Sequence, residues 1–357
     1  MHCGRPDRRG WRPLLLASLL GAGGCASLAD RIAAPDPGER APTRELLAME
    51  SGMGIERRSA RLDTGVVLSW REVPAAERGF WIETTPTDGG GLAFEMGTRK
   101  GRQDANPVAH RGSIVYLHGW QGEAAAMLPW ALAFAEHGYT GIAIDLRGHG
   151  ASGDAPPGYG PAEARDVAEL VSTLVTDGSI ASPVYLFGVS YGATTALFAG
   201  PLLRDRIAGV IALEPFANAA EGIRGGVRGW SRLADKSLRG KLANWAMRNQ
   251  TAPEGVERAI DEASMRLGID LRSVDAGEAV EEAATCMLLV HGTKDRWLSP
   301  DATRRMAERS AMARFVPVEG ANHLTLPLRI DLLETPIAEW MQATAAGQCP
   351  PATVRAD

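Results

Sequence analysis

Near-continuous apolar runs, separated by stretches with helical periodicity, constrain the fold of this chain more than any other feature. From residue 113 onward these runs lack the apolar–polar alternation of a half-exposed strand, which indicates strands covered on both faces in a parallel sheet. The segments that fit strands are 65–70, 92–97, 113–119, 140–146, 183–188, 207–214, 286–292 and 313–318. Their alternation with helices predicts an α/β fold with a doubly wound, mostly parallel central sheet of about eight strands.

One interval interrupts this alternation. Residues 217–283 contain no strand pattern and far exceed an ordinary connection of about 4–6 residues. Helical periodicity extends over 221–247 and 255–268 within the interval. Because a strand pattern resumes at residue 286, we interpret the interval as a helical cap inserted after the sixth strand of a single domain, residues 61–345.

The predicted cap is rich in basic residues. Residues 217–250 contain seven Lys or Arg side chains, against only Glu221 and Asp235, and Trp230 lies on the apolar face of the first predicted helix. A basic amphipathic helix with tryptophans can contact anionic lipid or an acidic substrate. A lid with one buried and one solvated face has the same pattern, and the sequence leaves both interpretations open.

The N-terminal segment has the layout of a secretory signal. Arginines within residues 5–12 precede an apolar core that ends in small residues, so we exclude residues 1–24 from the fold as a signal peptide. The residues before Cys25 resemble a bacterial lipoprotein cleavage box, in which the cysteine is lipidated; a plain cleaved signal is the alternative. Residues 25–60 then form a tether and N-terminal extension. We therefore expect an exported, periplasmic protein, either anchored in the membrane through Cys25 or soluble.

If the protein is exported, the two remaining cysteines lie in an oxidising compartment. Cys286 begins a predicted strand, and Cys349 lies in the C-terminal tail, residues 346–357. In an oxidising compartment these two residues could form a disulfide that pins the tail to the sheet. Alternatively, Cys286 is a small buried side chain without a partner.

A G-x-S-x-G motif at residues 188–192 is the first candidate for chemistry. Gly188, Ser190 and Gly192 follow an apolar strand and precede a run of small and apolar residues with helical periodicity. This strand–turn–helix context is the one in which a serine nucleophile is held on a tight turn. Glycines are needed there because the turn crowds the backbone. The alternative is an ordinary loop serine.

A serine hydroxyl needs a base, and the base needs a carboxylate to orient it. His323 follows the last predicted strand on a loop that can reach Ser190, whereas the alternative role for this histidine is helix capping. Asp295 lies just past the strand 286–292, at the carboxyl edge where α/β sheets build their sites. It could instead be a turn aspartate, and Glu214, which also ends a strand, is the backup acid.

The oxyanion of a tetrahedral intermediate also requires hydrogen-bond donors. The backbone N–H of Tyr191, directly after the serine, is the first candidate. The second is the backbone N–H of Trp120, on the loop after the strand 113–119. We expect His118 to shape this loop rather than to react.

Together these segments resemble the α/β-hydrolase superfamily, and most closely its lysophospholipase-like and serine-aminopeptidase-like branch. The residues that carry the resemblance are 118–122, 145–152, 188–192, 292–295 and His323. The resemblance extends over residues 61–345. It implies the triad Ser190, Asp295 and His323 in this order along the chain, but not the substrate.

The expected reaction is the cleavage of carboxylic esters of lipids or small molecules through an acyl-enzyme. A serine peptidase or aminopeptidase could use the same triad with cap acids such as Glu221 or Asp261 for the substrate amino terminus. A non-catalytic binding protein on this fold is a third possibility, against which the intact triad positions argue.

Several other functions are disfavoured. The formal net charge of the chain is −5, whereas a nucleic-acid-binding protein needs a basic surface. Gly148, Gly150 and Gly153 match a dinucleotide fingerprint, but Pro156 and Pro157 prevent the helix that the fingerprint requires. No apolar run approaches the roughly 20 residues of a membrane span. We find no metal-ligand spacing, expect no cofactor, and infer no obligate protein partner.

Overall fold

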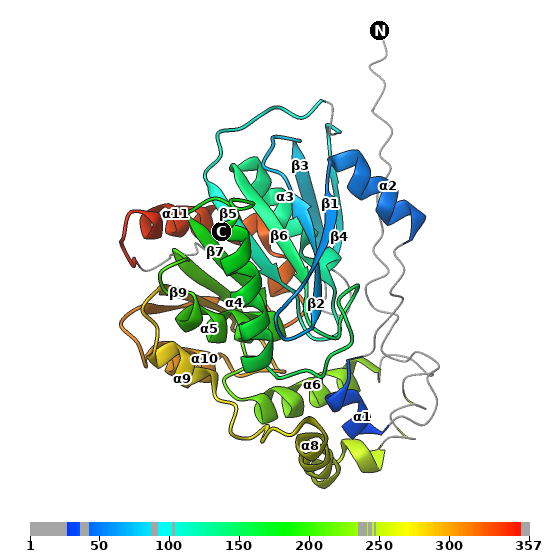
Figure 1. The fold of residues 1–357 in the computed structure, drawn as a ribbon. Helices are drawn as coiled ribbons and strands as arrows, with labels where there is room; N and C mark the ends of the chain where they lie inside the picture. Colours follow the sequence, from blue (N-terminus) through cyan, green and yellow to red (C-terminus); the bar gives the residue numbers. More distant parts are fainter. Residues whose placement is uncertain are drawn as a thin grey trace.

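The computed structural model describes residues 27–35, 43–86, 92–101, 104–234, 241, 245 and 248–350. The predicted signal peptide and Cys25 lie outside the described residues, as does the end of the predicted C-terminal tail. Figure 1 shows one central sheet with helices on both of its faces, and further helices at one end of the molecule.

The central sheet has eight strands and is mostly parallel. In spatial order they are β1 (Glu56–Arg61), β2 (Val67–Val73), β6 (Tyr139–Asp145), β5 (Gly112–Leu117), β7 (Val184–Val189), β8 (Gly209–Leu213), β9 (Cys286–Gly292) and β10 (Ala313–Val318). The strands from β6 to β10 in this order all run parallel, and β2 is antiparallel to both of its neighbours. The predicted fold class is therefore confirmed.

Two strands differ from the prediction. β1 has the sequence Glu-Arg-Arg-Ser-Ala-Arg and is exposed along almost its whole length, because it forms an edge of the sheet. Because a charged edge strand has no apolar pattern, we did not predict it from the sequence and assigned residues 56–60 to the N-terminal extension. The predicted strand 92–97 is instead β4 (Leu92–Thr98), which pairs with β3 (Phe80–Pro86) in a separate two-stranded sheet. Its alternating sequence suits this half-exposed hairpin.

The helices cover the two faces of the sheet and define two apolar cores. α3 (Leu128–Glu136) and α11 (Ile330–Ala345) cover one face; α4 (Pro161–Thr176), α5 (Tyr191–Leu202) and α10 (Pro300–Ala307) cover the other. β5 is wholly buried: Ile114 lies in the core on the side of α3 and α11, and Val115 lies in the core on the opposite side. Burial on both faces explains the continuous apolar runs. Two short 3-10 helices, η2 (Ala124–Met127) and η3 (Leu326–Leu328), complete the layers.

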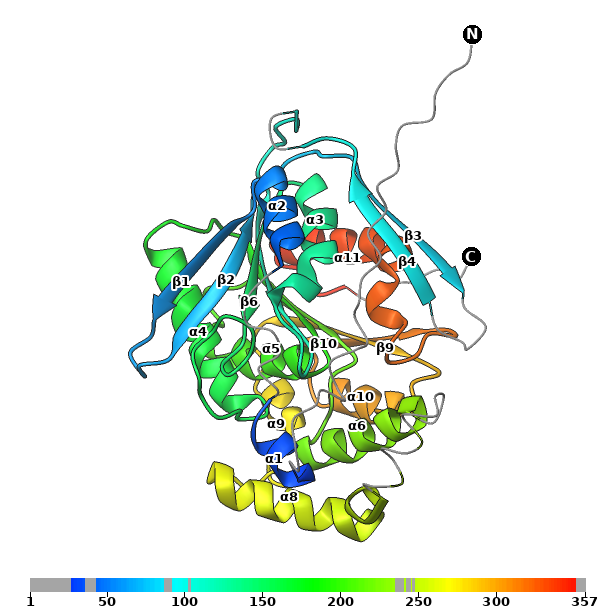
Figure 2. The ribbon, with the colours of Figure 1, turned by 90° about the vertical axis from the view of Figure 1, so that its right-hand side faces the viewer.

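The elements described between β8 and β9 are helices: α6 (Ala219–Ala234), α8 (Pro253–Leu267) and α9 (Ala276–Glu281). Figure 2 shows α6 and α8 together at one end of the sheet. The helical character of this interval agrees with the sequence pattern, while the boundaries of the cap at 217 and 283 stay a prediction. Within the described residues, none of the helices is both long and apolar enough to cross a bilayer.

Part of the predicted tether is packed structure. It contains α1 (Leu28–Ala33) and α2 (Arg44–Met53). α1 lies against α8, and its Leu28 and Ile32 side chains are buried in the apolar core that α8 shares (Figure 2). The backbone N–H of Leu28 donates to Gln250 Oε1 at 2.6 Å, and the Tyr159 hydroxyl donates to the Ile32 carbonyl at 2.8 Å. α1 is therefore an integral part of the cap side of the molecule.

A disulfide joins the start of β9 to the segment that follows α11. Cys286 and Cys349 are bonded with their Cα atoms 5.6 Å apart, a separation typical of protein disulfides. Of the two alternatives that the sequence left open, the structure contains the paired form. The bond holds the C-terminal segment against a buried central strand.

α6 packs closely against Trp297 because two positions on its face are glycine. A Cβ atom at Gly225 would overlap the carbonyl group of Trp297, and one at Gly229 would overlap its indole ring. Positions four residues apart lie on the same side of a helix, so both glycines face Trp297. Gly226, on the same helix, has open space where a Cβ would be.

We predict that Gly229→Ala destabilises the fold by about 1–3 kcal/mol, because the added methyl group must displace either α6 or the indole ring. Gly226→Ala is the matched control, and it should be neutral or stabilising by up to about 1 kcal/mol, since alanine favours a helix interior over glycine. Urea unfolding of the two variants beside the unaltered protein measures both effects. Equal stability of the two variants would contradict the close packing of α6.

Candidate active site

Ser190 stands on a strained turn between β7 and α5. Its backbone has φ 52° and ψ −111°, a conformation that residues with side chains rarely adopt. The turn is crowded: a Cβ at Gly188 would overlap the Gly192 backbone, and a Cβ at Gly192 would overlap the carbonyl of Leu117 at the end of β5. Glycine at both positions lets three backbone segments meet, and the serine side chain is held at the carboxyl edge of the sheet.

His323 lies within hydrogen-bond distance of this serine. It follows β10 in the loop before η3, and its Nε2 is 3.1 Å from Ser190 Oγ. The loop is held by a turn in which the Asn322 side chain accepts the N–H of Leu324 at 3.0 Å and Thr325 Oγ1 accepts the N–H of Asn322 at 2.9 Å. The side chain of His323 is only 10% exposed. The two residues that the sequence paired are therefore brought together across the sheet edge.

Asp295 binds the other ring nitrogen of the histidine. Its Oδ2 is 2.8 Å from His323 Nδ1 and 3.0 Å from Nε2 of the buried His291. Its Oδ1 accepts the backbone N–H groups of Trp297 at 2.7 Å and Leu298 at 3.0 Å. Burial opposes the ionisation of Asp295, but the hydrogen bonds from the two histidines outweigh it and hold its pKa well below the usual value. Asp295 is therefore a carboxylate at neutral pH.

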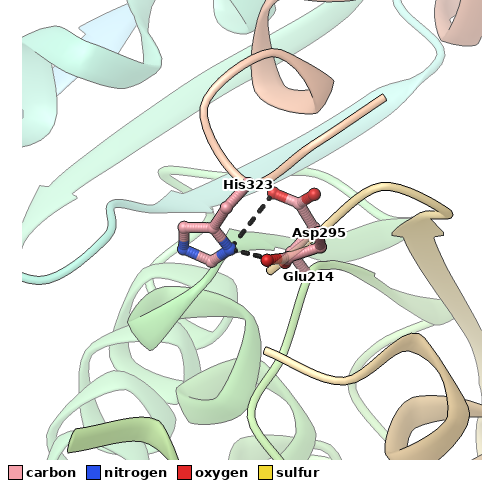
Figure 3. A group of neighbouring side chains, drawn as sticks. All are labelled: Glu214, Asp295 and His323. Atoms are coloured by element: carbon pink, nitrogen blue, oxygen red, sulfur yellow. Dashed lines mark hydrogen bonds and ion pairs between the residues drawn. The ribbon is translucent and has the colours of Figure 1, made fainter. Parts of the chain in front are cut away.

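Glu214 is a second acid beside the same histidine (Figure 3). Its Oε2 lies 3.5 Å from His323 Nδ1, a longer separation than that to Asp295. Burial, and then the charge of Asp295, raise the pKa of Glu214 well above its usual value, which favours the un-ionised form of this carboxyl group. The structure therefore makes Asp295 the hydrogen-bonded acid and leaves Glu214 next to it.

These acids and the histidine also form a possible ligand set for a metal ion. Atoms of Glu214, Asp295 and His323 lie within 4.8 Å of one another, the one such group of three among the described residues. However, His323 Nδ1 bonds Asp295 and Nε2 bonds Ser190, so both ring nitrogens already have partners. The arrangement thus fits proton transfer between Ser190 and His323 better than metal binding.

The loop after β5 lies against the serine turn. A Cβ at Gly119 would stand 3.7 Å from the Cβ of Ser190, and Gln121 has a positive φ of 58° that turns the chain back. Among the described residues, neither the backbone N–H of Trp120 nor that of Tyr191 donates a hydrogen bond within the protein. Both groups are therefore available as hydrogen-bond donors, while their role at an oxyanion stays a prediction.

The rings of Trp120 and Tyr191 build a buried aromatic cluster behind this loop. Trp120 stacks on Tyr159 with centroids 5.3 Å apart and lies 5.1 Å from the Tyr191 ring. The Tyr191 hydroxyl donates to Glu163 Oε1 at 2.8 Å. The cluster fixes the conformation of both segments whose N–H groups are free, so these side chains have a structural role.

Trp297 contacts the histidine and was not singled out from the sequence. Its ring stacks on the His323 ring with centroids 5.0 Å apart and an interplanar angle of 22°, and the ring of Trp230 on α6 contacts the Trp297 ring with centroids 5.2 Å apart. The only signals for this contact are an aromatic residue two positions after the acid and the glycines of α6. Neither signal is specific without the three-dimensional arrangement.

Comparisons with known proteins agree with this architecture. Residues 114–340 match the family described as the alpha/beta hydrolase family. Epoxide hydrolase B of Mycobacterium tuberculosis is 27% identical over 227 residues, which cover 56% of this chain and 63% of that protein. The chain thus spans less than two thirds of the length of this relative. The 2-(acetamidomethylene)succinate hydrolase of Mesorhizobium japonicum is 26% identical over 240 residues, which cover 60% of this chain and 84% of that protein.

Among solved structures, an esterase of Pyrococcus furiosus has a TM-score of 0.54 and 15% sequence identity. The match covers 88% of this chain and 96% of that chain. At this level of identity the likeness concerns the fold alone.

His118, on the loop after β5, has the structural role expected from the sequence. Its Nε2 accepts the backbone N–H of Leu146 at 3.1 Å, so Nδ1 carries the proton and donates to the Gly119 carbonyl at 2.8 Å. Burial first, and then the neighbouring His149, lower the pKa of His118 from 6.5 to about 3. The folded protein therefore needs this histidine in its neutral form.

We predict that stability falls as the pH is lowered below 6.5. In that range the unfolded chain takes up a proton that folded His118 excludes, which costs up to about 1.4 kcal/mol per pH unit. Urea unfolding between pH 7.5 and 5 measures the slope. The His118→Gln variant should have a shallower slope, and an unchanged slope would contradict this role.

Proposed function

Because this chain belongs to the α/β-hydrolase family, we propose that it is a serine hydrolase that cleaves carboxylic esters. The observation that carries the proposal is the continuous chain of hydrogen-bond distances from Ser190 through His323 to Asp295, 3.1 Å and 2.8 Å long. A serine on a strained turn, a histidine and an ionised carboxylate in this arrangement are the parts required for nucleophilic acyl transfer.

In the proposed mechanism, Ser190 Oγ attacks the acyl carbonyl while His323 Nε2 takes up its proton. Asp295 accepts the Nδ1–H bond, which fixes the tautomer that leaves Nε2 free and stabilises the imidazolium as it forms. The backbone N–H groups of Trp120 and Tyr191 stabilise the oxyanion. The imidazolium then protonates the leaving alcohol, and His323 activates a water molecule that hydrolyses the acyl-enzyme.

The proposed substrates are esters of lipids or small molecules, as in the lysophospholipase-like branch that the sequence resembles. A peptidase would need an acid available for the amino terminus of its substrate. Of the two cap acids considered for this role, Asp261 is paired with Arg272, and Glu221 is exposed at the start of α6. Of these two acids, the pairing with Arg272 therefore leaves only Glu221 available for the peptidase alternative.

We also propose that the protein functions outside the cytoplasm, as the N-terminal sequence predicts, either anchored through Cys25 or soluble. The bond between Cys286 and Cys349 supports this proposal, because structural disulfides persist mainly in oxidising compartments.

We predict that a fluorophosphonate probe labels the folded protein on Ser190. Ser190→Ala and His323→Ala should each lower the kcat of ester hydrolysis by about 10⁴–10⁶-fold, because each removes a group that acts in the same proton transfer. Intact mass and peptide mapping locate the adduct, and Ser179→Ala, at an exposed serine, should label normally. A folded protein without a Ser190 adduct would overturn the serine hydrolase proposal.

We predict further that esters are hydrolysed faster than the corresponding amides. A panel of nitrophenyl esters of increasing acyl length, beside aminoacyl anilides and short peptides, measures this preference as kcat/KM. The Ser190→Ala variant provides the blank for each substrate. Efficient cleavage of peptides without turnover of esters would favour the peptidase alternative.

A further inference from the structure

Glu214 occupies a position that is unfavourable for stability in two separate ways. Its side chain is fully buried, and neither carboxyl oxygen has a hydrogen-bond partner with good geometry among the described residues; the backbone N–H of Gly292 is the one donor near it. An unbonded polar group in the interior is destabilising, and such groups are rare. Its φ of 54° lies in the left-handed region, which is disfavoured for a residue with a Cβ. Because both the burial and the backbone conformation of Glu214 disfavour folding, we looked for a functional reason for this residue.

Both features occur directly beside the proposed triad. Glu214 follows β8, and Asp295 follows the end of the adjacent parallel strand β9, so the two acids leave the sheet at the same edge. Figure 3 shows both carboxyl groups directed at His323 Nδ1. Asp295 is bonded to this nitrogen at 2.8 Å, and Glu214 lies just beyond bonding distance at 3.5 Å.

The hydrogen-bond donors around the two acids decide which of them carries the charge. Asp295 accepts four N–H groups, two from histidine rings and two from the backbone, whereas Glu214 has only the backbone N–H of Gly292 near it, without good hydrogen-bond geometry. The titratable groups of this cluster are His291, His323 and Asp295. The charge of Asp295 is one of the two causes that raise the pKa of Glu214, so its removal would ease the ionisation of Glu214.

We propose that Glu214 is a reserve acid of the triad, a positioning residue that accepts the Nδ1–H bond of His323 when the Asp295 carboxylate is absent. The inference rests on the proposed serine hydrolase function. The Glu214 carboxylate would then hold the same imidazole tautomer, and the Ser190 proton would still pass to Nε2. Every bond that forms or breaks is the same as in the proposed mechanism, and only the acceptor of the Nδ1–H hydrogen bond differs.

The test compares Asp295→Ala, Glu214→Gln and the double variant in ester hydrolysis. Alanine is preferable to asparagine at position 295, because an amide could donate to Nδ1 and impose the wrong tautomer. Glu214→Gln alone should lower kcat by less than about tenfold, since Asp295 remains in place. Asp295→Ala should retain activity at least about tenfold above the double variant, which should fall to the level of His323→Ala.

The pH profile separates a reserve acid from a merely structural residue. In Asp295→Ala the remaining activity should rise with pH as Glu214 ionises, and this rise should disappear in the double variant. Because Asp295 also accepts backbone N–H groups, Asp295→Ser is a second background that keeps an oxygen for the N–H of Trp297. Thermal unfolding shows that each background is folded.

The outcomes distinguish the two proposals. If the unaltered protein lacks a Ser190 adduct with the fluorophosphonate, the serine hydrolase proposal fails. If that adduct forms, but the single and double variants at 295 and 214 have equal activity and equal pH profiles in both backgrounds, only the reserve-acid inference fails.

Discussion

The close approach of three backbone segments at the end of β7 is the constraint on which the rest of the site depends. Gly188 and Gly192 permit this approach, since any side chain there would overlap neighbouring main chain. The approach forces Ser190 into its strained conformation and places it at the carboxyl edge of the sheet. His323 and Asp295 then need only loops that follow neighbouring parallel strands, because such strands end at the same edge.

Sequence patterns were sufficient to predict the fold class and to select Ser190, His323 and Asp295, which the structure brings within hydrogen-bond distance of one another. Buried parallel strands and tight turns restrict residue types strongly, which is why these features could be predicted. They were insufficient where local pattern and tertiary role diverge. β1 is a charged edge strand without an apolar face, so its sequence gives no strand signal. The hairpin strand 92–97 has an ordinary strand pattern, but pairing partners are set by the whole topology. The stack of Trp297 on His323 could not be predicted either, because no spacing in the sequence indicates that these two rings are in contact.

The two acids beside His323 show that environment rather than residue type sets the charge of a carboxyl group. Both are buried and lie next to the same nitrogen, yet hydrogen bonds from two histidines lower the pKa of Asp295, whereas burial and the charge of Asp295 raise that of Glu214. Ionisation of one acid therefore opposes ionisation of the other. The distribution of donors places the negative charge on Asp295, which is bonded to His323 Nδ1.

The docking of α1 on α8 has a consequence for the loop after β5. Leu28 and Ile32 are buried in this contact, and the Ile32 carbonyl accepts the hydroxyl of Tyr159. The Tyr159 ring in turn stacks on Trp120, whose backbone N–H is a proposed oxyanion donor. The helix α1 therefore couples the packing of the cap side to the conformation of the loop that lies beside Ser190.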